Sequence, residues 1–360
     1  MAEPLKNLFD ANLINSIGIA VKNEYRLFKL DTFVADVFDQ EWKNKELKQR
    51  LTHVTICLHK NIPLTYVAQI EILTSIAPNF TGFTALFFPE FVSTFGLDDY
   101  NVSIKALAYF TKYSSSEFAV RNFIVLYPDK MLKQHLIWAK DKNHHVRRLA
   151  SEGIRPRLPW AMALTQFKKD PTPIIPILEL LKADESEYVR KSVANCLNDI
   201  SKDHPEILLQ IVKKWKGNDK NTDWIIKHAS RGLLKNGNTQ ALKLFGLNHQ
   251  LIVKVLDLKL DKLALKIGET LSFETTVYLN ENAAQQIRME YNIYYMKSNG
   301  KTSPKIFQIG TYQVKPKQHL TLKRSHKFIE LSTRKHYPGE HVLALVINGK
   351  EVAQQKFMLH

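Results

Sequence analysis

The chain has 360 residues, 44% of them hydrophobic, and a formal net charge of +16 at pH 7. This length and apolar content exclude an intrinsically disordered chain and suffice for more than one buried core. No apolar run reaches the ~20 residues that span a bilayer, and the N-terminus lacks a signal-peptide pattern, so we expect a soluble, cytoplasmic protein. The excess of cations favours a polyanionic partner, with nucleic acid first and a membrane surface second.

Residues 1–110 predict a bundle of helices, because apolar residues recur at spacings of three and four. Pro63, Pro78 and residues 96–98 separate these helices. We assign the bundle no chemistry and expect it to support the helices that follow. The predicted helices span 11–25, 31–44, 46–60, 64–76, 83–95 and 102–113.

Helices continue to about residue 245, and several of them share a repeated pattern. Each copy begins with polar or acidic residues, then has Val or Ile followed by a cation, and a small residue one turn later. The four anchor pairs are Val120-Arg121, Val146-Arg147, Val189-Arg190 and Ile226-Lys227. Two of the intervals approach the ~40-residue period of two-helix solenoid repeats. We therefore predict an all-α HEAT-like repeat solenoid over residues 1–247, with these later helices at 117–127, 129–141, 143–155, 173–183, 186–203, 204–216, 222–235 and 238–245.

The cations that follow the anchors are Arg121, Arg147, Arg190 and Lys227. A ladder of cations repeated once per helix pair suits a sugar-phosphate backbone lying across the solenoid. The alternative is structural, because a charge removed from water needs a partner, and such arginines often pair with an acidic residue of a neighbouring repeat. Both interpretations stay open for the three arginines.

From residue 251 the pattern changes to short alternating runs with hairpin signals at Asn299-Gly300 and Asn348-Gly349. About seven short strands in ~110 residues predict an all-β immunoglobulin-like sandwich over residues 251–360, without a disulfide. This part holds 17 Lys and Arg against 9 Asp and Glu. Its basic segments either contact DNA or keep the domain soluble. They span 297–305, 315–327 and 334–335.

The two cysteines, Cys57 and Cys196, lie far apart in helical apolar patterns. Neither has metal-ligating residues at suitable spacing, so buried thiols are expected rather than a disulfide or a zinc site. We expect no metal and no cofactor.

Acidic residues accompany the cations on the predicted polar face. Glu117, Glu152 and Asp199 come from three copies of the repeat, and with Asn195 they are expected to converge. Carboxylates repel phosphate, so their presence on a cationic wall indicates a ligand group that carries positive charge. Trp160 follows two prolines that end the preceding helix and stiffen the loop, which presents its indole.

An indole beside carboxylates suits a flat cationic ligand, such as an N-alkylated purine in DNA. The positive charge of such a base already weakens its N-glycosidic bond. An enzyme then needs mainly to stabilise the oxocarbenium-like sugar and to position water. Each residue also has a structural alternative: a packing role for Trp160, a favourable charge at a helix N-terminus for Glu117, and a partner of Lys202 for Asp199.

Three segments, 117–121, 145–160 and 189–205, closely resemble the AlkC-type 3-methyladenine DNA glycosylases of the HEAT-like-repeat superfamily. The segments 3–9 and 222–235 are similar to the same family, so the resemblance covers residues 1–245. The C-terminal domain is similar to the immunoglobulin-like domain of the longer members.

The resemblance implies a monofunctional enzyme of the bacterial cytoplasm that acts on duplex DNA. It implies removal of small N3-alkylated purines, chiefly 3-methyladenine, to leave an abasic site in bent DNA without complete flipping of the base. Residue by residue, it implies catalytic roles for Glu117, Glu152, Trp160 and Asp199, and DNA contacts for Arg148, Arg155 and Arg157.

Within that set we expect Asp199 to stabilise the sugar, and Glu117 or Glu152 to contact the lesion or orient water. No lysine stands out as a Schiff-base nucleophile. A monomer is expected to suffice. Two alternatives remain: a non-enzymatic HEAT-repeat protein that binds DNA or RNA, with the acids in ion pairs between repeats, and a protein-interaction scaffold.

Overall fold

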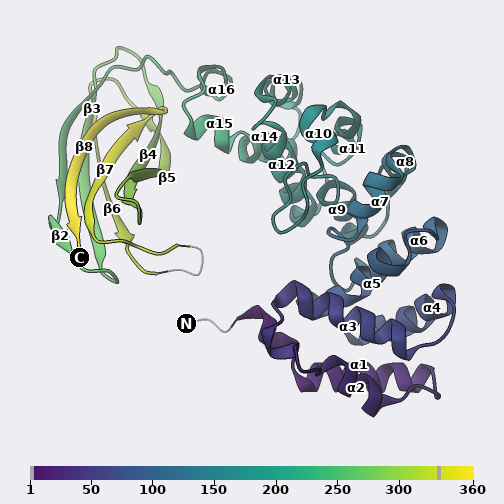
Figure 1. Ribbon diagram of the computed structural model, residues 1–360. Helices are drawn as coiled ribbons and strands as arrows, with labels where there is room; N and C mark the ends of the chain where they lie inside the picture. The colour runs from purple at the N-terminus through teal and green to yellow at the C-terminus, as the bar shows by residue number, and fades with distance from the viewer. Residues whose placement is uncertain (1–3, 331–333) are drawn as a thin grey trace. The chain divides into compact units, whose positions relative to one another are not determined.

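The computed structural model describes residues 4–330 and 334–360, so Glu3 of the N-terminal matching segment lies outside the described residues. The predicted fold class is confirmed: helices are followed by a β-sandwich (Figure 1). The chain forms two compact units. The first holds the residues up to His204 together with Trp215–Ala229, and the second holds Pro205–Lys214 and Ser230–His360. None of the helices among the described residues has the length and apolar content of a membrane span. The division into domains of residues 1–247 and 251–360 remains a proposal.

The first six α-helices form the predicted N-terminal bundle. Side chains cap the first turns of α1 and α4: Asp10 accepts a hydrogen bond from the Leu13 amide and Thr65 accepts one from the Ala68 amide. The helix predicted over 31–44 ends early, at Val37, and His53 hydrogen-bonds to the carbonyls of Asp36 and Val37 in its last turn. The helices are α1 (Ala11–Glu24), α2 (Leu30–Val37), α3 (Leu47–Asn61), α4 (Tyr66–Ile76), α5 (Phe87–Phe95) and α6 (Tyr100–Phe110).

The repeat region follows in the first unit, and α9, α12 and α14 pack side by side. Val146, Leu149, Val189 and Val193 are buried at these contacts, as expected for the apolar face of each copy. The helix predicted over 143–155 ends at Glu152, shortly before Pro156, a residue type that interrupts helices. The helices are α7 (Val120–Leu126), α8 (Pro128–Trp138), α9 (His144–Glu152), α10 (Thr165–Lys169), α11 (Ile175–Leu180), α12 (Glu187–Ile200) and α14 (Lys220–Ala229).

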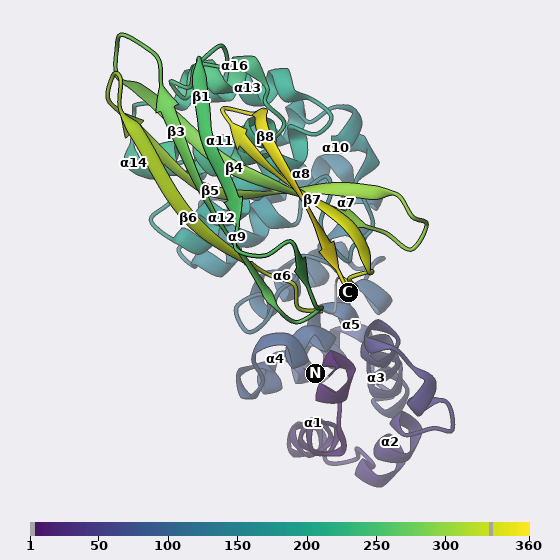
Figure 2. The same cartoon turned by 90° about the vertical axis from the view of Figure 1, so that its left-hand side faces the viewer.

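The second unit contains a sandwich of two sheets. One sheet has the order β1-β3-β6, which run alongside one another in Figure 2, and the other has the order β2-β8-β7-β4-β5. All pairs are antiparallel except β2 with β8. The strands are β1 (Val253–Leu260), β2 (Ala264–Leu265), β3 (Thr270–Leu279), β4 (Gln285–Met296), β5 (Thr302–Val314), β6 (His319–Lys327), β7 (Gly339–Ile347) and β8 (Lys350–Leu359).

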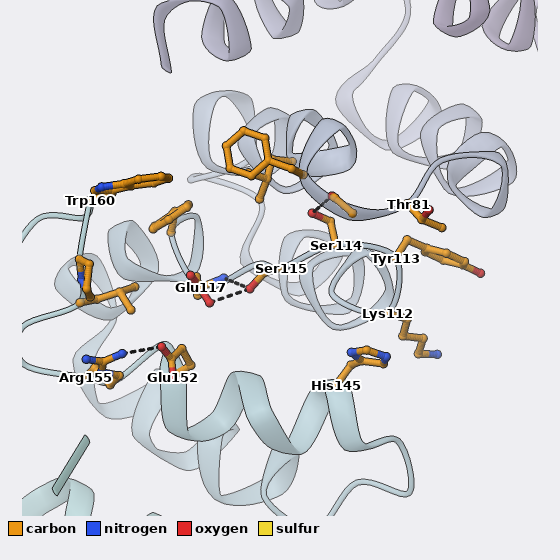
Figure 3. Close-up of a pocket in the computed structure, with 16 residues that line it drawn as sticks. Thr81, Lys112, Tyr113, Ser114, Ser115, Glu117, His145, Glu152, Arg155 and Trp160 are labelled. Carbon is orange, nitrogen blue, oxygen red and sulfur yellow. Dashed lines mark hydrogen bonds and ion pairs between the residues drawn. The ribbon is translucent and has the colours of Figure 1, made fainter. Parts of the chain in front are cut away.

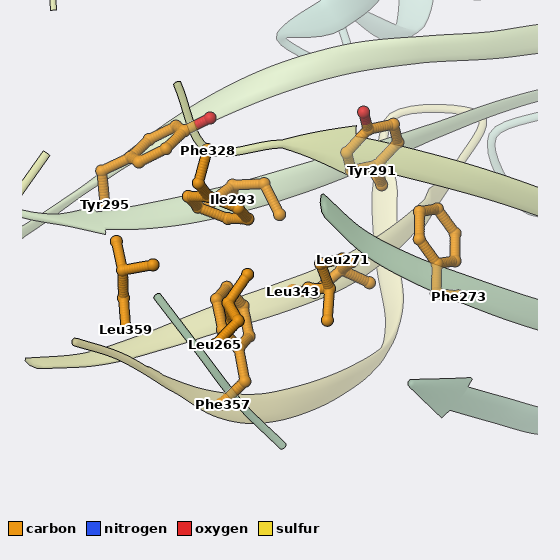
Figure 4. Packing of buried hydrophobic residues seen from close by; sticks show 10 residues of the cluster. All are labelled: Leu265, Leu271, Phe273, Tyr291, Ile293, Tyr295, Phe328, Leu343, Phe357 and Leu359. Carbon is orange, nitrogen blue, oxygen red and sulfur yellow. The ribbon is translucent and has the colours of Figure 1, made fainter. Parts of the chain in front are cut away.

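Alternating residues of the strands meet between the sheets and form the core. Phe273, Tyr291, Ile293, Leu343 and Phe357 belong to one buried cluster there (Figure 4). The predicted turn between β7 and β8 is confirmed, because Asn348 and Gly349 both have positive φ, of 47° and 78°. Both cysteines are buried free thiols, as their helical apolar patterns predict.

Residues 230–250 pack against the sandwich within the second unit. This segment includes α15 (Arg231–Lys235) and α16 (Thr239–Leu244), while α13 (Pro205–Trp215) lies mostly in the same unit. The Asn348 side chain donates to the Asn248 carbonyl at 2.7 Å. A Cβ added to Gly237 would lie 2.8 Å from the Gly349 carbonyl oxygen, so the two glycines permit a close backbone approach.

Candidate active site

A chain of ion pairs joins three successive copies of the repeat in the first unit. Arg148 of α9 pairs with Glu117, just before α7, and its Nη2 lies 3.4 Å from Oε1 of Glu152. Arg155 donates from Nη1 to Oε1 of Glu152 at 2.7 Å, and from Nε to Oδ2 of Asp199 at 2.9 Å. The three acids therefore lie along one series of ion pairs, in which two arginines alternate with them, rather than around a single point.

These charges are almost completely removed from water. The side chains of Glu152 and Asp199 are 6% and 3% exposed, and Arg155 is 10% exposed. Burial acts to lower the pKa of Arg155, but the carboxylates of Glu152 and Asp199 outweigh it and hold that pKa above its ordinary value. Lys202, which is half exposed, is the last member of this series of ion pairs, and its Nζ lies 3.1 Å from Oδ1 of Asp199. Each carboxylate is thus neutralised by arginine or lysine in this state.

Two of these carboxylates line a cavity of about 750 Å³. Glu117 and Glu152 face it together with Arg155, and Trp160 stands at its edge (Figure 3). Asp199 is not among the lining residues; it lies behind Arg155. The volume falls in the range of small-molecule sites and exceeds what a single nucleobase fills.

The two ends of the cavity differ in chemistry. Phe83 and Phe118, which also line an adjoining pocket together with Trp160, make the end of the cavity at Trp160 aromatic. Lys112, Tyr113 and His145 gather at the other end (Figure 3). Burial lowers the pKa of His145, and the neighbouring His144 adds to the effect. The cavity therefore offers an aromatic surface, two carboxylates and a polar end.

The Trp160 indole is presented to solvent, as its position after two prolines predicts. Its side chain is 61% exposed, and its ring meets Phe83 edge-on with centroids 6.5 Å apart. The backbone of Trp160 has a φ of 65°, in the left-handed region that non-glycine residues rarely occupy. Lys48 of α3 donates to its carbonyl oxygen. Contacts from elsewhere in the fold thus hold a strained backbone at the cavity edge.

Several supporting residues were missed by the sequence analysis. The Arg148 guanidinium lies over the Tyr188 ring, 4.9 Å from its centroid, and donates to Ser115 Oγ at 2.8 Å. Ser115 donates in turn to Glu117 at 2.9 Å. No local signal marks Tyr188 or Lys48, because each reaches the site from a helix distant in sequence.

The cations after the repeat anchors have different environments. Arg121 is completely buried. Arg147 pairs with Asp184, with 2.6 Å between Nε and Oδ2, and this bond raises the pKa of Arg147. Arg190 donates to the carbonyl oxygens of Asp184 and Glu185. Only Arg147 makes the ion pair that the structural alternative expects; Arg121 and Arg190 donate to backbone carbonyls instead, and Lys227 is exposed.

Arg157, expected at a DNA contact, pairs with Asp203 at 2.7 Å, and this bond holds the pKa of Arg157 above its ordinary value. The guanidinium is still about one-third exposed. Within the part of the chain that the structure describes, no group of three or more His, Cys, Asp or Glu is arranged to hold a metal ion.

Comparison with known proteins places this arrangement in a family. The model of the family described as "DNA alkylation repair enzyme" matches residues 106–233, which include the ion-pair chain and the Trp160 loop. A second model, "Uncharacterised protein YhaZ, C-terminal Ig-like domain", matches residues 254–360. The chain belongs to the DNA alkylation repair enzyme family and carries an immunoglobulin-like domain at its C-terminal end.

Two full-length similarities make the relationship more specific. The Bacillus subtilis (strain 168) protein named "Uncharacterized protein YhaZ" is 43% identical over 346 residues, covering 96% of each chain. The Pseudomonas fluorescens alkylpurine DNA glycosylase AlkC, solved bound to DNA containing an abasic site analog, is 37% identical with a TM-score of 0.95. That similarity covers 99% of this chain and all of the AlkC chain.

Proposed function

We propose that this protein is a monofunctional DNA glycosylase. It hydrolyses the N-glycosidic bond of small cationic N3-alkylated purines, chiefly 3-methyladenine, in duplex DNA and leaves an abasic site. The observation that carries the proposal is the cavity that brings the Trp160 indole together with the carboxylates of Glu117 and Glu152. The similarity to AlkC, an alkylpurine DNA glycosylase solved with DNA, supports the same activity and a DNA partner.

The proposed chemistry uses the charge that the lesion already carries. The indole attracts the cationic base through its π face, and a nearby carboxylate adds electrostatic attraction. The N-glycosidic bond breaks with its electron pair going to the base, which leaves as neutral 3-methyladenine. Asp199 stabilises the oxocarbenium-like sugar, and Glu152 or Glu117 orients the water that adds to it and accepts the proton. The base reacts without complete extrusion from the duplex.

The ion pairs imply an exchange of partners when DNA binds. Glu117 and Glu152 are both paired with arginines in the free protein, and the positive charge of these arginines offsets the attraction of either carboxylate for a cationic lesion. DNA phosphates compete with Glu117 for Arg148, which lies at the outer end of the ion-pair chain. Once Arg148 contacts phosphate, Glu117 becomes available to the cationic base, whereas Glu152 and Asp199 keep Arg155 as their partner.

The test is release of free base from methylated duplex DNA by the purified protein. Chromatography would compare 3-methyladenine with 7-methylguanine in the released fraction. We expect preferential release of 3-methyladenine, with abasic sites accumulating in equal amount and no strand cleavage. Tight DNA binding without release of any base would contradict the proposal.

One observation favours a second candidate, a non-enzymatic DNA- or RNA-binding repeat protein. The network carboxylates Glu117, Glu152 and Asp199 are all in ion pairs, as a purely structural network requires. Both candidates predict steep loss of affinity with salt, because phosphate contacts dominate both. A preference for alkylated over intact duplex distinguishes the glycosylase from the simple binder.

The β-sandwich is proposed as an auxiliary DNA contact rather than a source of chemistry. Because residues 230–250 pack on the sandwich, truncation near Leu247 would disrupt the second unit as well as remove it. Charge-neutralising variants in the full chain are therefore the better test. Lys297, Lys301, Lys323 and Lys327 are exposed, and their change to Gln is expected to weaken duplex binding without abolishing base release. Unchanged affinity would reject the contact.

A further inference from the structure

Arg121 has an unusual environment for a buried cation. Its side chain is 0% exposed, and it forms no ion pair among the described residues. It donates instead to three backbone carbonyls: from Nε to Met162 at 2.8 Å, and from Nη1 to Gly153 and Arg155 at 3.0 Å each. Burying a charge without an ion-pair partner costs desolvation free energy, which its hydrogen bonds must offset. We therefore ask which segment these hydrogen bonds hold in place.

The three carbonyls belong to one loop, which begins at the end of α9 and carries Trp160. Gly153 and Arg155 lie at its start and Met162 at its end, so a single guanidinium ties both ends together. The backbone hydrogen bonds of the loop itself are few and long: the Ala161 amide donates to the Leu158 carbonyl at 3.3 Å, and the Leu164 amide just beyond the loop donates to the Pro156 carbonyl at 3.2 Å. The tie from Arg121 is therefore a main determinant of the loop conformation.

This loop positions two groups of the proposed active site. Arg155 bridges Glu152 and Asp199 from the start of the loop, and Trp160 stands at the cavity from its far part. The left-handed backbone at Trp160 persists only if its surroundings over-determine it. Lys48 holds the Trp160 carbonyl from one side, and Arg121 closes the loop from the other.

We propose that Arg121 is a positioning residue, whose guanidinium clamps the ends of the loop 153–162 and thereby sets Trp160 and Arg155 for the reaction. The inference rests on the proposed glycosylase function for its activity readout. Arginine suits the position because its planar group presents several donors in fixed directions, whereas a lysine ammonium cannot meet three carbonyls in this geometry. Burial lowers the pKa of Arg121 to about 10, so the clamp keeps its charge at neutral pH.

The test compares Arg121→Lys with a matched control, Arg50→Lys. Arg50 is also nearly buried and donates to backbone carbonyls, those of Lys45 and Lys6, but it belongs to α3 and touches neither the loop nor the cavity. Both variants would be compared with wild type for thermal unfolding, affinity for abasic duplex and the single-turnover rate of base release.

A second readout follows the loop without requiring activity. Trp42, Trp138 and Trp215 are buried, whereas Trp160 is 61% and Trp224 36% exposed. In a Trp224→Phe background, quenching of tryptophan fluorescence by acrylamide and by iodide then reports chiefly on Trp160. If wild type releases no base, the proposed function fails, yet quenching still tests the clamp.

We expect Arg121→Lys to change the quenching of Trp160 and to slow base release by roughly tenfold to 100-fold, because small misplacements of reacting groups cost this much. Affinity for abasic duplex should change by less than about threefold, since no phosphate contact is removed. Arg50→Lys should alter stability without these effects. Wild-type quenching and release in folded Arg121→Lys would overturn the proposal.

Arg121→Gln is the second variant, because it keeps amide donors without burying a charge. It should fold and preserve part of the tie, with quenching and release between those of wild type and Arg121→Lys. If both variants unfold under conditions where Arg50→Lys is folded, Arg121 serves the fold alone and the positioning role is rejected.

Discussion

Arg155 and Asp199 are joined by an ion pair of 2.9 Å between Nε and Oδ2, which links the loop after α9 to α12. The same guanidinium binds Glu152 at 2.7 Å. Two nearly buried carboxylates from successive repeats thus share one cation. Without it their mutual repulsion would oppose placing both beside one reacting sugar.

Removing the shared cation should expose that repulsion. We expect Arg155→Met to destabilise the first unit by about 3 kcal/mol, because breaking a buried ion pair leaves unpaired charge. Adding Glu152→Gln to it should restore part of the loss. Urea unfolding of the two single variants and the double variant measures this coupling. Strictly additive losses would show that the three groups do not act as one network.

Replacing Asp199 or Glu152 by its amide is expected to slow base release more than it weakens DNA binding. Asp199→Asn should lower the rate of 3-methyladenine release by roughly 100-fold, as for loss of one group that stabilises transition-state charge. Glu152→Gln should also reduce it. Both variants should bind abasic duplex as wild type does, and single-turnover assays with binding titrations separate the two effects. Release at the wild-type rate would exclude the assigned roles.

Trp160 and Trp224 provide a matched pair of exposed indoles. Trp160→Ala should reduce base release by about tenfold, in keeping with the loss of one cation–π contact. Its unfolding free energy should stay near that of wild type, because the side chain is mostly exposed. Trp224→Ala, whose ring stacks on His228 away from the cavity, should keep release unchanged. Equal losses in both variants would indicate an unspecific effect.

The salt dependence of DNA binding distinguishes exposed from paired cations. Lys227→Gln should reduce the slope of log affinity against log salt by about 1, as for loss of one phosphate contact. Arg147→Gln should leave that slope unchanged and lower stability, because Arg147 is paired with Asp184. Binding isotherms between low and moderate salt provide the slopes. A smaller slope for Arg147→Gln would show that Arg147 contacts a DNA phosphate after all.

Acid should destabilise the first unit partly through His135. Burial lowers the pKa of His135 to about 4, and its Nδ1 donates to the Met131 carbonyl at 2.7 Å. Because the pKa of His135 is lower in the folded than in the unfolded chain, its contribution to the free energy of unfolding is complete above pH ~6.5 and is lost as pH falls toward 4. From pH 7 to 5 the loss should be about 2 kcal/mol.

The measurement is urea unfolding at both pH values for wild type and His135→Leu. The variant should lose about 2 kcal/mol less on acidification, whatever its stability at pH 7. His319→Gln is the control, because His319 is exposed on β6 and should keep the wild-type pH dependence. An unchanged pH dependence in His135→Leu would contradict a buried neutral imidazole.

Much of the fold was predictable because its determinants are local. The spacing of apolar residues and the anchor pairs such as Val146-Arg147 indicated the helices of the repeats, and the Asn348-Gly349 turn indicated a hairpin of the sandwich. Errors occurred where distant groups intervene. The helix expected over 31–44 stops at Val37, where His53 from another helix hydrogen-bonds to the last carbonyls.

The sequence by itself determined which residue types recur once per repeat, and its motifs indicated the acids, Trp160 and the family resemblance. Tertiary structure decided which charges meet. Arg147 pairs with Asp184 and Arg155 pairs with Asp199, whereas Arg121 donates to the carbonyls of a loop more than 30 residues further along. Helical periodicity tells which face a side chain occupies, since it depends on backbone geometry alone. The partner of a buried charge depends on how successive repeats stack, and that is settled only when the whole unit packs.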